Sequence, residues 1–330
     1  IHKRPNVSAP AREKVEQALK EMNYQPNMYA SALAHNKSYT FYLFIPKHEQ
    51  EAYWEEIEEG ANKAMEARRD FHIDVRLVYY ERFDDASFRQ ESKACLALRP
   101  DGVIIVPAEP AVTQEFTDAM HEQGVPFVML DSYLPALHPL SFYGQDSFSS
   151  GYFAARVLMM EAAGAQEIML MKQMKNGSVV SKQQANREVG FRHYMETHYP
   201  EVSINEVNLP LDDTKDTYAA ILEDYFTRHT LTRHCITFGS KAHLVGEFLQ
   251  RTNRADVHIM GYDMVGKNAE CLKKGSISFL IAQHAYQQGY SCVEALFRTI
   301  VLKKEVQPVN YMPIELIMKE NIDFYRRTQL

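Results

Sequence analysis

The sequence predicts an α/β protein with two domains in series, each built on a mostly parallel sheet covered by helices on both faces. Its 330 residues are enough for about two domains. Apolar runs of four to seven residues alternate with longer helical patterns along most of the chain, which is typical of parallel strands joined by helices. Roughly twelve such units exceed one sheet of ordinary size, so we expect two sheets.

The N-terminal segment precedes these units and predicts two short helices. A Ser-Ala-Pro start at Ser8, followed by apolar residues at helical spacing up to Met22, predicts a capped helix. Pro26 and Asn27 favour a second start, because proline suits the first turn and asparagine is a good N-cap. We expect this second helix over residues 27–35.

The charge of the chain is unevenly distributed. Residues 1–38 carry a net charge of +3, whereas the remainder carries −10. Such an asymmetry is typical of a nucleic-acid-contacting end attached to an acidic body. Chance scatter over so short a segment is the alternative.

The body of the chain is predicted as alternating strands and helices. Strands are expected at 40–45, 73–79, 102–106, 126–130, 141–144, 167–171, 204–209, 235–238, 257–261, 278–282 and 309–318. Helices are expected between them at 53–69, 87–98, 112–123, 151–162, 182–197, 214–229, 242–251, 266–274 and 285–302.

Several protein classes are disfavoured by motifs that the chain lacks. It has no Gly-x-Gly-x-x-Gly after a strand, no phosphate-binding Gly-x4-Gly-Lys-[Ser/Thr] loop and no Gly-x-Ser-x-Gly elbow. We therefore expect no cofactor and no enzymatic activity. Four scattered cysteines and thirteen histidines without paired spacing disfavour a disulfide frame and a metal site. Without an apolar run of membrane-spanning length or a signal-peptide core, we expect a cytoplasmic protein.

Ligands of doubly wound sheets bind beyond the carboxyl ends of the strands. The residues that follow each predicted strand are therefore the first candidates for a binding site. They are Pro46-Lys47-His48, Pro107-Ala108-Glu109, Asp131-Ser132-Tyr133, Gln145-Asp146-Ser147, Gln173 to Gln183, Gly239-Ser240-Lys241, Tyr262-Asp263 and Gln283-His284.

Several motifs, taken in order, carry a resemblance to a known family. They are Val7-Ser8-x4-Glu13-Lys14-Val15-x8-Tyr24-x-Pro26-Asn27-x2-Ala30-x2-Leu33, Gln145-Asp146-Ser147-Phe148-x2-Gly151-Tyr152-x-Ala154, Arg187-x2-Gly190-Phe191, Gly261-Tyr262-Asp263, Ile281-Ala282-Gln283-x5-Gly289 and Ile314-Glu315-Leu316-Ile317. The chain resembles the LacI/GalR family of bacterial transcriptional regulators over nearly its whole length. It starts at the end of that family's DNA-binding headpiece, so we expect it to lack most of the helix-turn-helix.

The resemblance implies an architecture of two Rossmann-like subdomains of the type I periplasmic-binding-protein class, preceded by a partial helical headpiece. The headpiece remnant and hinge helix would take residues 1–37. The first subdomain would take 38–163 and 285–303, and the second 164–284 and 304–330. Three crossovers are expected near 163–166, 282–284 and 303–308.

The resemblance also implies contacts to DNA. In that family, paired hinge helices of a homodimer enter the minor groove, where a leucine wedges between base steps. The matching residue is Leu33, with Tyr29 and Ala30 alongside it. Asn27 and Lys37 would contact phosphate groups in a salt-sensitive way. The alternative for Leu33 is packing against the body.

Two effector contacts follow from the resemblance, at Asp263 and Arg187. A carboxylate accepts hydrogen bonds from two sugar hydroxyls, and a guanidinium donates in a planar fork. The alternative for Asp263 is a helix N-cap before Gly266. The alternative for Arg187 is a surface ion pair with Glu188 or Glu51.

Four further positions complete the expected effector site. Tyr53 and Trp54 match positions where sugar-binding relatives place an aromatic ring, with core packing as the alternative. Gln283 matches a position that hydrogen-bonds ligand, and Phe148 lies in the turn over residues 145–149. In that same turn, Gln145 replaces a common aspartate.

Basic residues raise the question of the effector's charge. Lys241 stands where the family usually has an acidic residue. The cleft would be basic if it held all four cations that follow or flank the strands, namely Lys47, Lys182, Arg187 and Lys241. An anionic effector such as a sugar phosphate or a uronate would then fit. The alternative is that these lysines face solvent or pair with Asp263 and Glu109.

Taken together, these observations favour a ligand-responsive repressor whose cleft binds a carbohydrate or sugar phosphate. Closure of the cleft would change the spacing of the hinge helices in a homodimer and so control operator binding. A periplasmic or free-standing sugar-binding protein with the same fold is the first alternative, although it gives no reason for the segment before residue 38. An enzyme of sugar metabolism is the second, and no catalytic constellation supports it.

Overall fold

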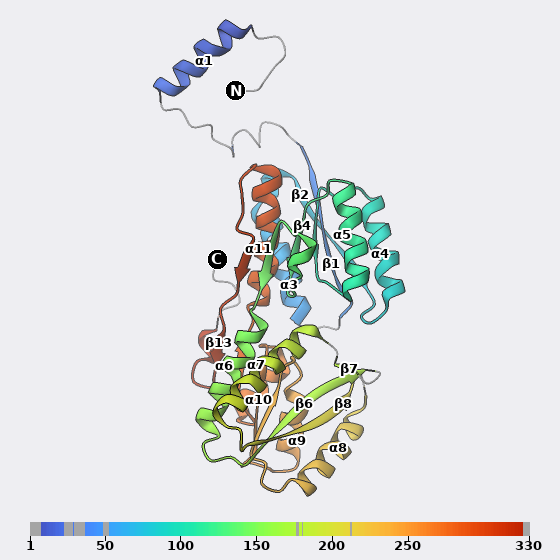
Figure 1. Cartoon of the computed structure of the whole chain (residues 1–330), viewed down its shortest axis with the longest axis vertical. Coiled ribbons are helices and arrows are strands. Elements are labelled where there is room, and N and C mark those ends of the chain that lie inside the picture. The colour runs from blue at the N-terminus through green and yellow to red at the C-terminus, as the bar shows by residue number, and fades with distance from the viewer. Residues whose placement is uncertain are drawn as a thin grey trace.

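The computed structural model describes residues 8–22, 29, 37–48, 53–175, 178–179, 181–211 and 213–325. Within them the chain forms two α/β halves arranged end to end, and helix α1 (Ala9–Glu21) lies apart from both (Figure 1). The helix predicted from Ser8 is confirmed as α1. Among the described helices, none combines the length and apolar character needed to span a bilayer.

The first half is built on a six-stranded sheet in the order β12-β5-β4-β3-β1-β2, in which every pairing is parallel. Its strands are β1 (Tyr39–Pro46), β2 (Ile73–Tyr80), β3 (Gly102–Ile105), β4 (Phe127–Leu130), β5 (Ser141–Gly144) and β12 (Val309–Tyr311). Its helices are α3 (Tyr53–Ala67) and α11 (Ala285–Leu296) on one face, and α4 (Asp85–Ala97) and α5 (Pro110–Glu122) on the other. A π-helical turn, Phe297–Val301, extends α11.

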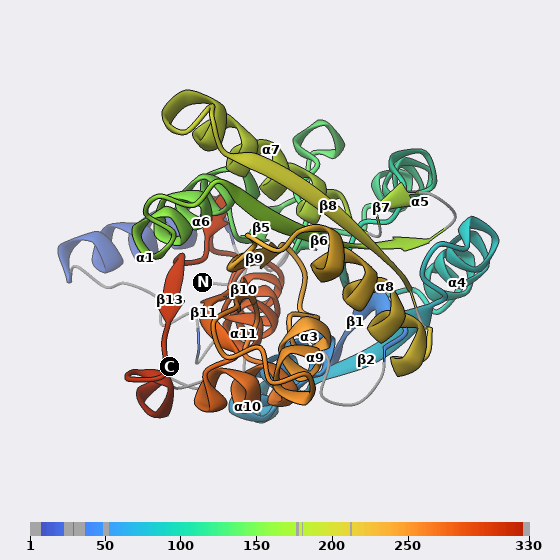
Figure 2. The same cartoon turned by 90° about the horizontal axis from the view of Figure 1, so that it is seen from below.

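The second half is built on a seven-stranded sheet in the order β13-β11-β10-β9-β6-β7, with β8 also paired to β6. Its strands are β6 (Glu167–Lys175), β7 (Ser178–Val179), β8 (Ser203–Pro210), β9 (His234–Thr237), β10 (His258–Tyr262), β11 (Ile277–Ala282) and β13 (Glu315–Ile317). Figure 2 shows α6 (Ser147–Glu161) and α7 (Lys182–His198) on one face, and α8 (Lys215–Arg228), α9 (His243–Arg251) and α10 (Gly266–Lys274) on the other. Only β7 and β13 run antiparallel to their neighbours among the described strands.

Strand β1 illustrates why these apolar runs form central strands. Phe41, Leu43 and Ile45 point into the core under α3 and α11, whereas Tyr42 and Phe44 point into the core under α4 and α5. Successive side chains of a strand face opposite sides, so a strand covered on both sides must be apolar at every position. Each fully buried side chain of this size contributes about 1.5–3 kcal/mol.

The predicted boundaries between the halves are wrong at two of the three crossovers. The predicted first subdomain includes the helix after β5, but this helix, α6, packs on α7 and shares its core with β6 and β9. The predicted strand over residues 309–318 is in fact two strands, because β12 pairs with β5 in the first sheet and β13 pairs with β11 in the second. The chain therefore crosses between the halves at 145–146, at 283–284 and at 312–314.

Helices α6 and α7 approach one another closely through two glycines. A Cβ atom added at Gly151 would lie 1.9 Å from the carbonyl oxygen of Arg187, and one added at Gly190 would lie 2.1 Å from that of Phe148. Both obstacles are backbone atoms, so a side chain at either position would push the helices apart. This contact fixes the position of α7, which carries Arg187.

Substituting Gly151→Ala tests this close contact. Alanine normally stabilises a helix interior relative to glycine by about 0.5–1 kcal/mol. Here we expect the opposite sign, a loss of about 1–3 kcal/mol, because overpacking displaces backbone. Urea denaturation measures the change, and the exposed Ser149→Ala on the same helix is the control. A stabilised Gly151→Ala protein would contradict the close approach.

Candidate ligand-binding site

A cavity of about 460 Å³ lies between the two halves, where the carboxyl ends of their parallel strands face each other. It is lined by the start of α7 and by residues at or just after the ends of eight strands, namely β1, β2, β3, β4, β5, β9, β10 and β11. This is the position that the post-strand residues predicted, because ligands of such sheets bind beyond the carboxyl ends of the strands. A cavity of this size falls within the range of small-molecule sites.

Two buried aspartates occupy corresponding positions in the two halves. The strand order β2-β1-β3-β4-β5 of the first sheet matches β8-β6-β9-β10-β11 of the second. Asp131 follows β4 and Asp263 follows β10, and both line the cavity. Both have left-handed backbones, with φ of 68° and 67°. Such conformations cost free energy and concentrate at functional sites.

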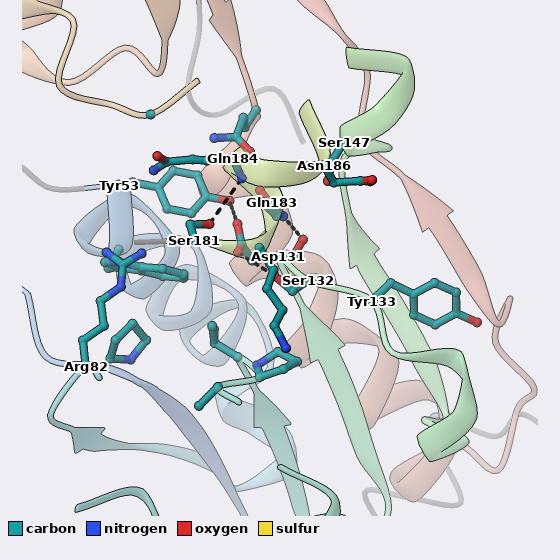
Figure 3. A pocket seen from close by; sticks show the side chains of 18 of the residues that line it. Tyr53, Arg82, Asp131, Ser132, Tyr133, Ser147, Ser181, Gln183, Gln184 and Asn186 are labelled. Atoms are coloured by element: carbon teal, nitrogen blue, oxygen red, sulfur yellow. Dashed lines mark hydrogen bonds between the residues drawn. The ribbon is translucent and has the colours of Figure 1, made fainter. Parts of the chain in front are cut away.

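Asp131 is held on the first-half side of the cavity. The Tyr53 hydroxyl donates to its Oδ1 at 2.9 Å, and Gln288 Nε2 donates to that hydroxyl oxygen at 3.0 Å. The Gln183 side-chain amide, which comes from α7 in the second half, donates to the backbone carbonyl of Asp131. Figure 3 shows Tyr53, Asp131 and Gln183 converging on one another. The two halves are therefore hydrogen-bonded across the cavity wall.

Arg187 lies at the centre of the second-half side and is 2% exposed. Its NH1 donates to the Phe238 carbonyl at 2.8 Å, and its NH2 donates to Gln183 Oε1 at 2.9 Å and to Gln283 Oε1. The guanidinium also lies 4.2 Å from the centre of the Tyr262 ring. Its Nε has no hydrogen-bond partner among the described residues.

Asp263 is placed by the crossover between the halves. Gln283 Nε2 donates to Asp263 Oδ1 at 2.7 Å, so one glutamine joins the carboxylate to Arg187. The loop that carries Asp263 is fixed by Asn268, whose Nδ2 donates to the Tyr262 carbonyl at 2.9 Å and to the Asp263 carbonyl at 3.1 Å. The carboxylate is thus preorganised before any ligand binds.

Burial controls the protonation of this site. Burial raises the pKa of the Asp263 carboxyl to about 6, and the Arg187 guanidinium and the Gln283 amide oppose the rise. Burial likewise raises the pKa of Asp131, again against the influence of Arg187. The pKa of Tyr53 lies well above its ordinary range because its hydroxyl is buried beside Asp131. The free energy of removing two charges from water exceeds the free energy of their attraction unless additional hydrogen bonds satisfy both charged groups.

The structure brings together five of the predicted effector residues and leaves out two. Asp263, Arg187, Gln283, Tyr53 and Trp54 line the cavity, and Trp54 packs edge-to-face on Tyr53 with ring centres 5.0 Å apart. Phe148 and Lys241 do not belong to its lining. Phe148 lies on the outside of α6, 37% exposed, against Tyr152 and His193, and Lys241 is exposed.

The alternatives for the two central residues can also be decided. Arg187 makes no surface ion pair, because it is buried and bonded to amides and a carbonyl. Asp263 does not cap α10, whose N-cap position is Val265 without a side-chain cap. Both side chains therefore face the cavity for reasons other than helix or surface structure.

Few of the predicted DNA-contacting residues can be placed. Asn27, Ala30, Leu33 and the hinge helix expected over 27–35 lie outside the described residues. The Tyr29 ring lies 6.0 Å from Phe71 and 6.4 Å from Phe297. Lys37 pairs with Asp101 at 3.2 Å.

The prediction of a basic cleft is wrong. The described lining contains seven acidic residues and three basic ones. Lys182 pairs with Glu109 at 3.4 Å, and Lys47 pairs with Glu81 at 2.7 Å. Arg187 already has several partners in the protein. The alternative, in which the lysines pair with acids or face solvent, describes the structure better.

Three further cavity residues are identifiable from the sequence by the strand-end rule. Asp131 belongs to the residues that follow the predicted strand over 126–130, and Gln183 ends the stretch from Gln173. Arg82 follows β2 and lines the cavity, and the same rule applied to that strand would have found it. Asn186, which directly precedes Arg187 on α7, also lines the cavity, and no strand-end rule identifies it.

This arrangement can bind hydroxyl groups. The carboxyl groups of Asp131 and Asp263 can accept hydrogen bonds, and the indole ring of Trp54 gives an apolar wall. No group of three metal-ligating side chains occurs among the described residues.

The fold and this cavity are those of a class of proteins with a ligand-sized cavity between two α/β lobes. Residues 41–304 match the family described as a periplasmic binding protein domain. The chain therefore belongs to this family, and its fold is of the type I class.

Three relatives illustrate the range of this family. A solved structure from Bacteroides fragilis, provisionally assigned as a LacI transcriptional regulator, is 41% identical, with a TM-score of 0.85, over 88% of this chain and 100% of that one. The ribose operon repressor of Lactococcus lactis is 20% identical over 95% of this chain and 91% of its own length. The xylose/arabinose-binding protein XylF of Sulfolobus acidocaldarius is 20% identical over 70% of this chain, which spans 59% of that protein. These relatives are named as regulators or binding proteins, not as enzymes.

The raised pKa of Asp263 predicts a pH-dependent stability. Because the folded protein binds this proton more tightly than the unfolded chain, the carboxyl contributes stability at low pH that is lost as pH rises from about 4 to about 6. Ligand-free Asp263→Asn should therefore exceed the parent in stability at pH 7.5 by on the order of 2 kcal/mol. This advantage should vanish below pH 4.

Urea denaturation at several pH values measures the effect. The exposed Asp118→Asn is the matched control, and it should change stability by less than about 0.5 kcal/mol at any pH. If the free energies of unfolding of the parent and of Asp263→Asn change with pH in the same way, burial does not raise the pKa of this carboxyl.

Proposed function

We propose that this chain is the effector-binding part of a sugar-responsive transcriptional regulator, most simply a repressor. One observation carries the proposal. The alignment with the ribose operon repressor includes 95% of this chain, so it extends into the segment before residue 38, where α1 lies. A sugar-binding protein alone gives no role to a helix that lies apart from both sheets.

The chemistry of the cavity supports a sugar as the effector. Asp131 and Asp263 offer carboxylate oxygens from opposite sides, and each can accept hydrogen bonds from vicinal hydroxyls. Hydrogen bonds that involve a charged partner are roughly twice as strong as neutral ones. Trp54 supplies a face on which a sugar ring can stack.

The charge of the cavity supports a neutral sugar over a sugar phosphate or a uronate. Acidic residues outnumber basic ones in the described lining, so an added anion would meet net repulsion. The guanidinium of Arg187, which would be the natural anion partner, is enclosed by Gln183, Gln283 and the Phe238 carbonyl. We therefore favour a neutral pentose or hexose.

Regulation then follows from the two-lobed architecture. Bonds across the cavity wall, such as that from Gln183 to the Asp131 carbonyl, depend on the angle between the halves. A sugar that binds more tightly to the conformation with one of these angles shifts the population toward that conformation. In a homodimer, that shift would change the distance between the N-terminal segments and so the affinity for operator DNA. A protein acting in this way works in the cytoplasm.

Calorimetry against a panel of neutral sugars and sugar phosphates tests the effector. A neutral sugar should bind, and Asp263→Asn should weaken it about 10- to 100-fold, because charged hydrogen bonds are lost. Trp54, the single tryptophan of the chain, lines the cavity, so its fluorescence gives a second readout. Lys241→Ala, outside the lining, is the control. Equal affinities of Asp263→Asn and the parent would refute the site.

Binding to DNA separates the regulator from a free-standing sugar-binding protein. The full-length gene product should bind DNA from upstream of its own operon, more weakly as salt rises, because phosphate contacts release counterions. The sugar found by calorimetry should change that affinity at least fivefold, the lower end of ordinary allosteric coupling. Gel-shift titrations at several salt concentrations measure both effects. If no DNA binds at any salt concentration, with or without sugar, the protein is a binding protein only.

A further inference from the structure

The side chain of Gln145 lies where all three crossovers between the halves meet. It follows β5 in the first crossover and is 2% exposed. Its Nε2 donates to the carbonyl oxygen of Ala282, at the end of β11, at 3.2 Å and to that of Pro313, in the third crossover, at 2.9 Å. One amide therefore ties the first crossover to the other two.

The same side chain connects this junction to the cavity. Gln145 Oε1 accepts from Ser150 Oγ at 2.7 Å, and Ser150 Oγ lies 3.0 Å from the Tyr262 hydroxyl. A serine has one hydroxyl proton and a glutamine carbonyl can only accept, so the Tyr262 hydroxyl is the donor to Ser150. Donation runs in one direction, from Tyr262 through Ser150 to Gln145 and on to the two backbone carbonyls.

Tyr262 lies directly behind two residues that line the cavity, Arg187 and Asp263. Its ring lies 4.2 Å from the Arg187 guanidinium, and the next residue is Asp263. A ligand that displaces Arg187 or Asp263 therefore acts on a side chain whose hydroxyl is bonded to the junction. Tyr262 and Ser150 are both fully buried, so water cannot replace a broken link.

Rotation of the two lobes takes place in the crossovers, because these are the segments that join them. Hinge motions are absorbed by a few residues at the ends of elements. A buried amide that loses its partners costs free energy, so the Gln145 bonds favour one arrangement of the three crossovers over intermediate ones. Two discrete arrangements are what a ligand needs in order to shift a population.

We propose that Gln145 is the positioning residue of the hinge: it fixes the arrangement of the three crossovers and links that arrangement to cavity occupancy through Ser150 and Tyr262. The link to a sugar rests on the proposed function, whereas the control of the hinge does not. Gln145 also lines the cavity, but both polar atoms of its side chain are bonded within the protein, so its role in this proposal is to hold the crossovers and not to bind the sugar.

Spin labels on the two halves measure the hinge directly. Glu122→Cys and Glu201→Cys place labels on exposed positions of the first and second halves, and the four native cysteines are buried. In the ligand-free protein, Gln145→Leu should widen the distribution of label distances at least about twofold, because the crossovers lose their common tie. With sugar bound, it should reduce the ligand-induced shift by more than about half while changing affinity less than about tenfold.

Two further variants distinguish the hydrogen bonds from Gln145 to the two backbone carbonyls from the link through Ser150 to Tyr262. Gln145→Glu keeps an acceptor for Ser150 but cannot donate to the two carbonyls, so it should behave as Gln145→Leu does. Ser150→Ala keeps the tie and removes the link to Tyr262. It should leave the ligand-free distribution narrow and reduce the sugar-induced shift.

The matched control is Gln287→Leu, the same chemical change on α11, where the amide bonds only Ser291 at 3.0 Å among the described residues. It should match the parent in both readouts. A Gln145→Leu or Gln145→Glu protein with parental width and shift would overturn the proposal. If Gln145→Leu does not fold, Gln145→Glu and Ser150→Ala decide it.

Failure of the proposed function would be seen separately. If no sugar shifts the labels of the parent, the sugar-responsive regulator is refuted. The ligand-free distributions still decide the role of Gln145: widening by Gln145→Glu but not by Gln287→Leu supports it, and equal widths contradict it.

Discussion

The structure of the cavity wall and the protonation of its two aspartates depend on the positive charge of the Arg187 guanidinium. It is buried between a backbone carbonyl, two glutamine oxygens and the face of Tyr262. Without it, Asp131 and Asp263 would lose the nearby charge that limits the rise of both pKa values. A buried charge is tolerated only when paired and hydrogen-bonded, so the glutamines of α7 and of the second crossover, and the glycine contact that positions α7, all follow from this requirement.

The site is built by repetition of one structural unit. Equivalent strands of the two sheets end in an aspartate with a left-handed backbone, and the cavity forms where the two ends face each other. Each aspartate is costly in the empty protein, through burial and through its backbone. A buried carboxylate therefore lowers the stability of the empty protein. The hydroxyl groups of the proposed sugar would offset that cost by donating hydrogen bonds to the carboxylate oxygens.

Much of the fold was predictable because it depends on local pattern. Apolar runs buried on both faces identified the strands, and the rule that ligands lie beyond strand ends found the edge that carries Asp131, Asp263 and Gln283. The assignment of α6 and β12 failed for a definite reason. Helix α6 follows a strand of the first half but packs in the second, whereas β12 stays in the first sheet although the next strand, β13, belongs to the second. Which partner buries a helix or strand is decided by contacts between residues distant in sequence.

The sequence by itself determined the class of fold, the edge of the sheets that carries the cavity, and the separate character of the N-terminal segment. Periodicity and composition carry that information in every short window. Tertiary structure decided the sign of the cavity's charge and the direction of each side chain. Lys182 and Lys47 meet acids from other segments, Lys241 and Phe148 turn outward, and Gln145 reaches two backbone carbonyls more than 130 residues away. Such pairings depend on distances through space, which no local pattern encodes.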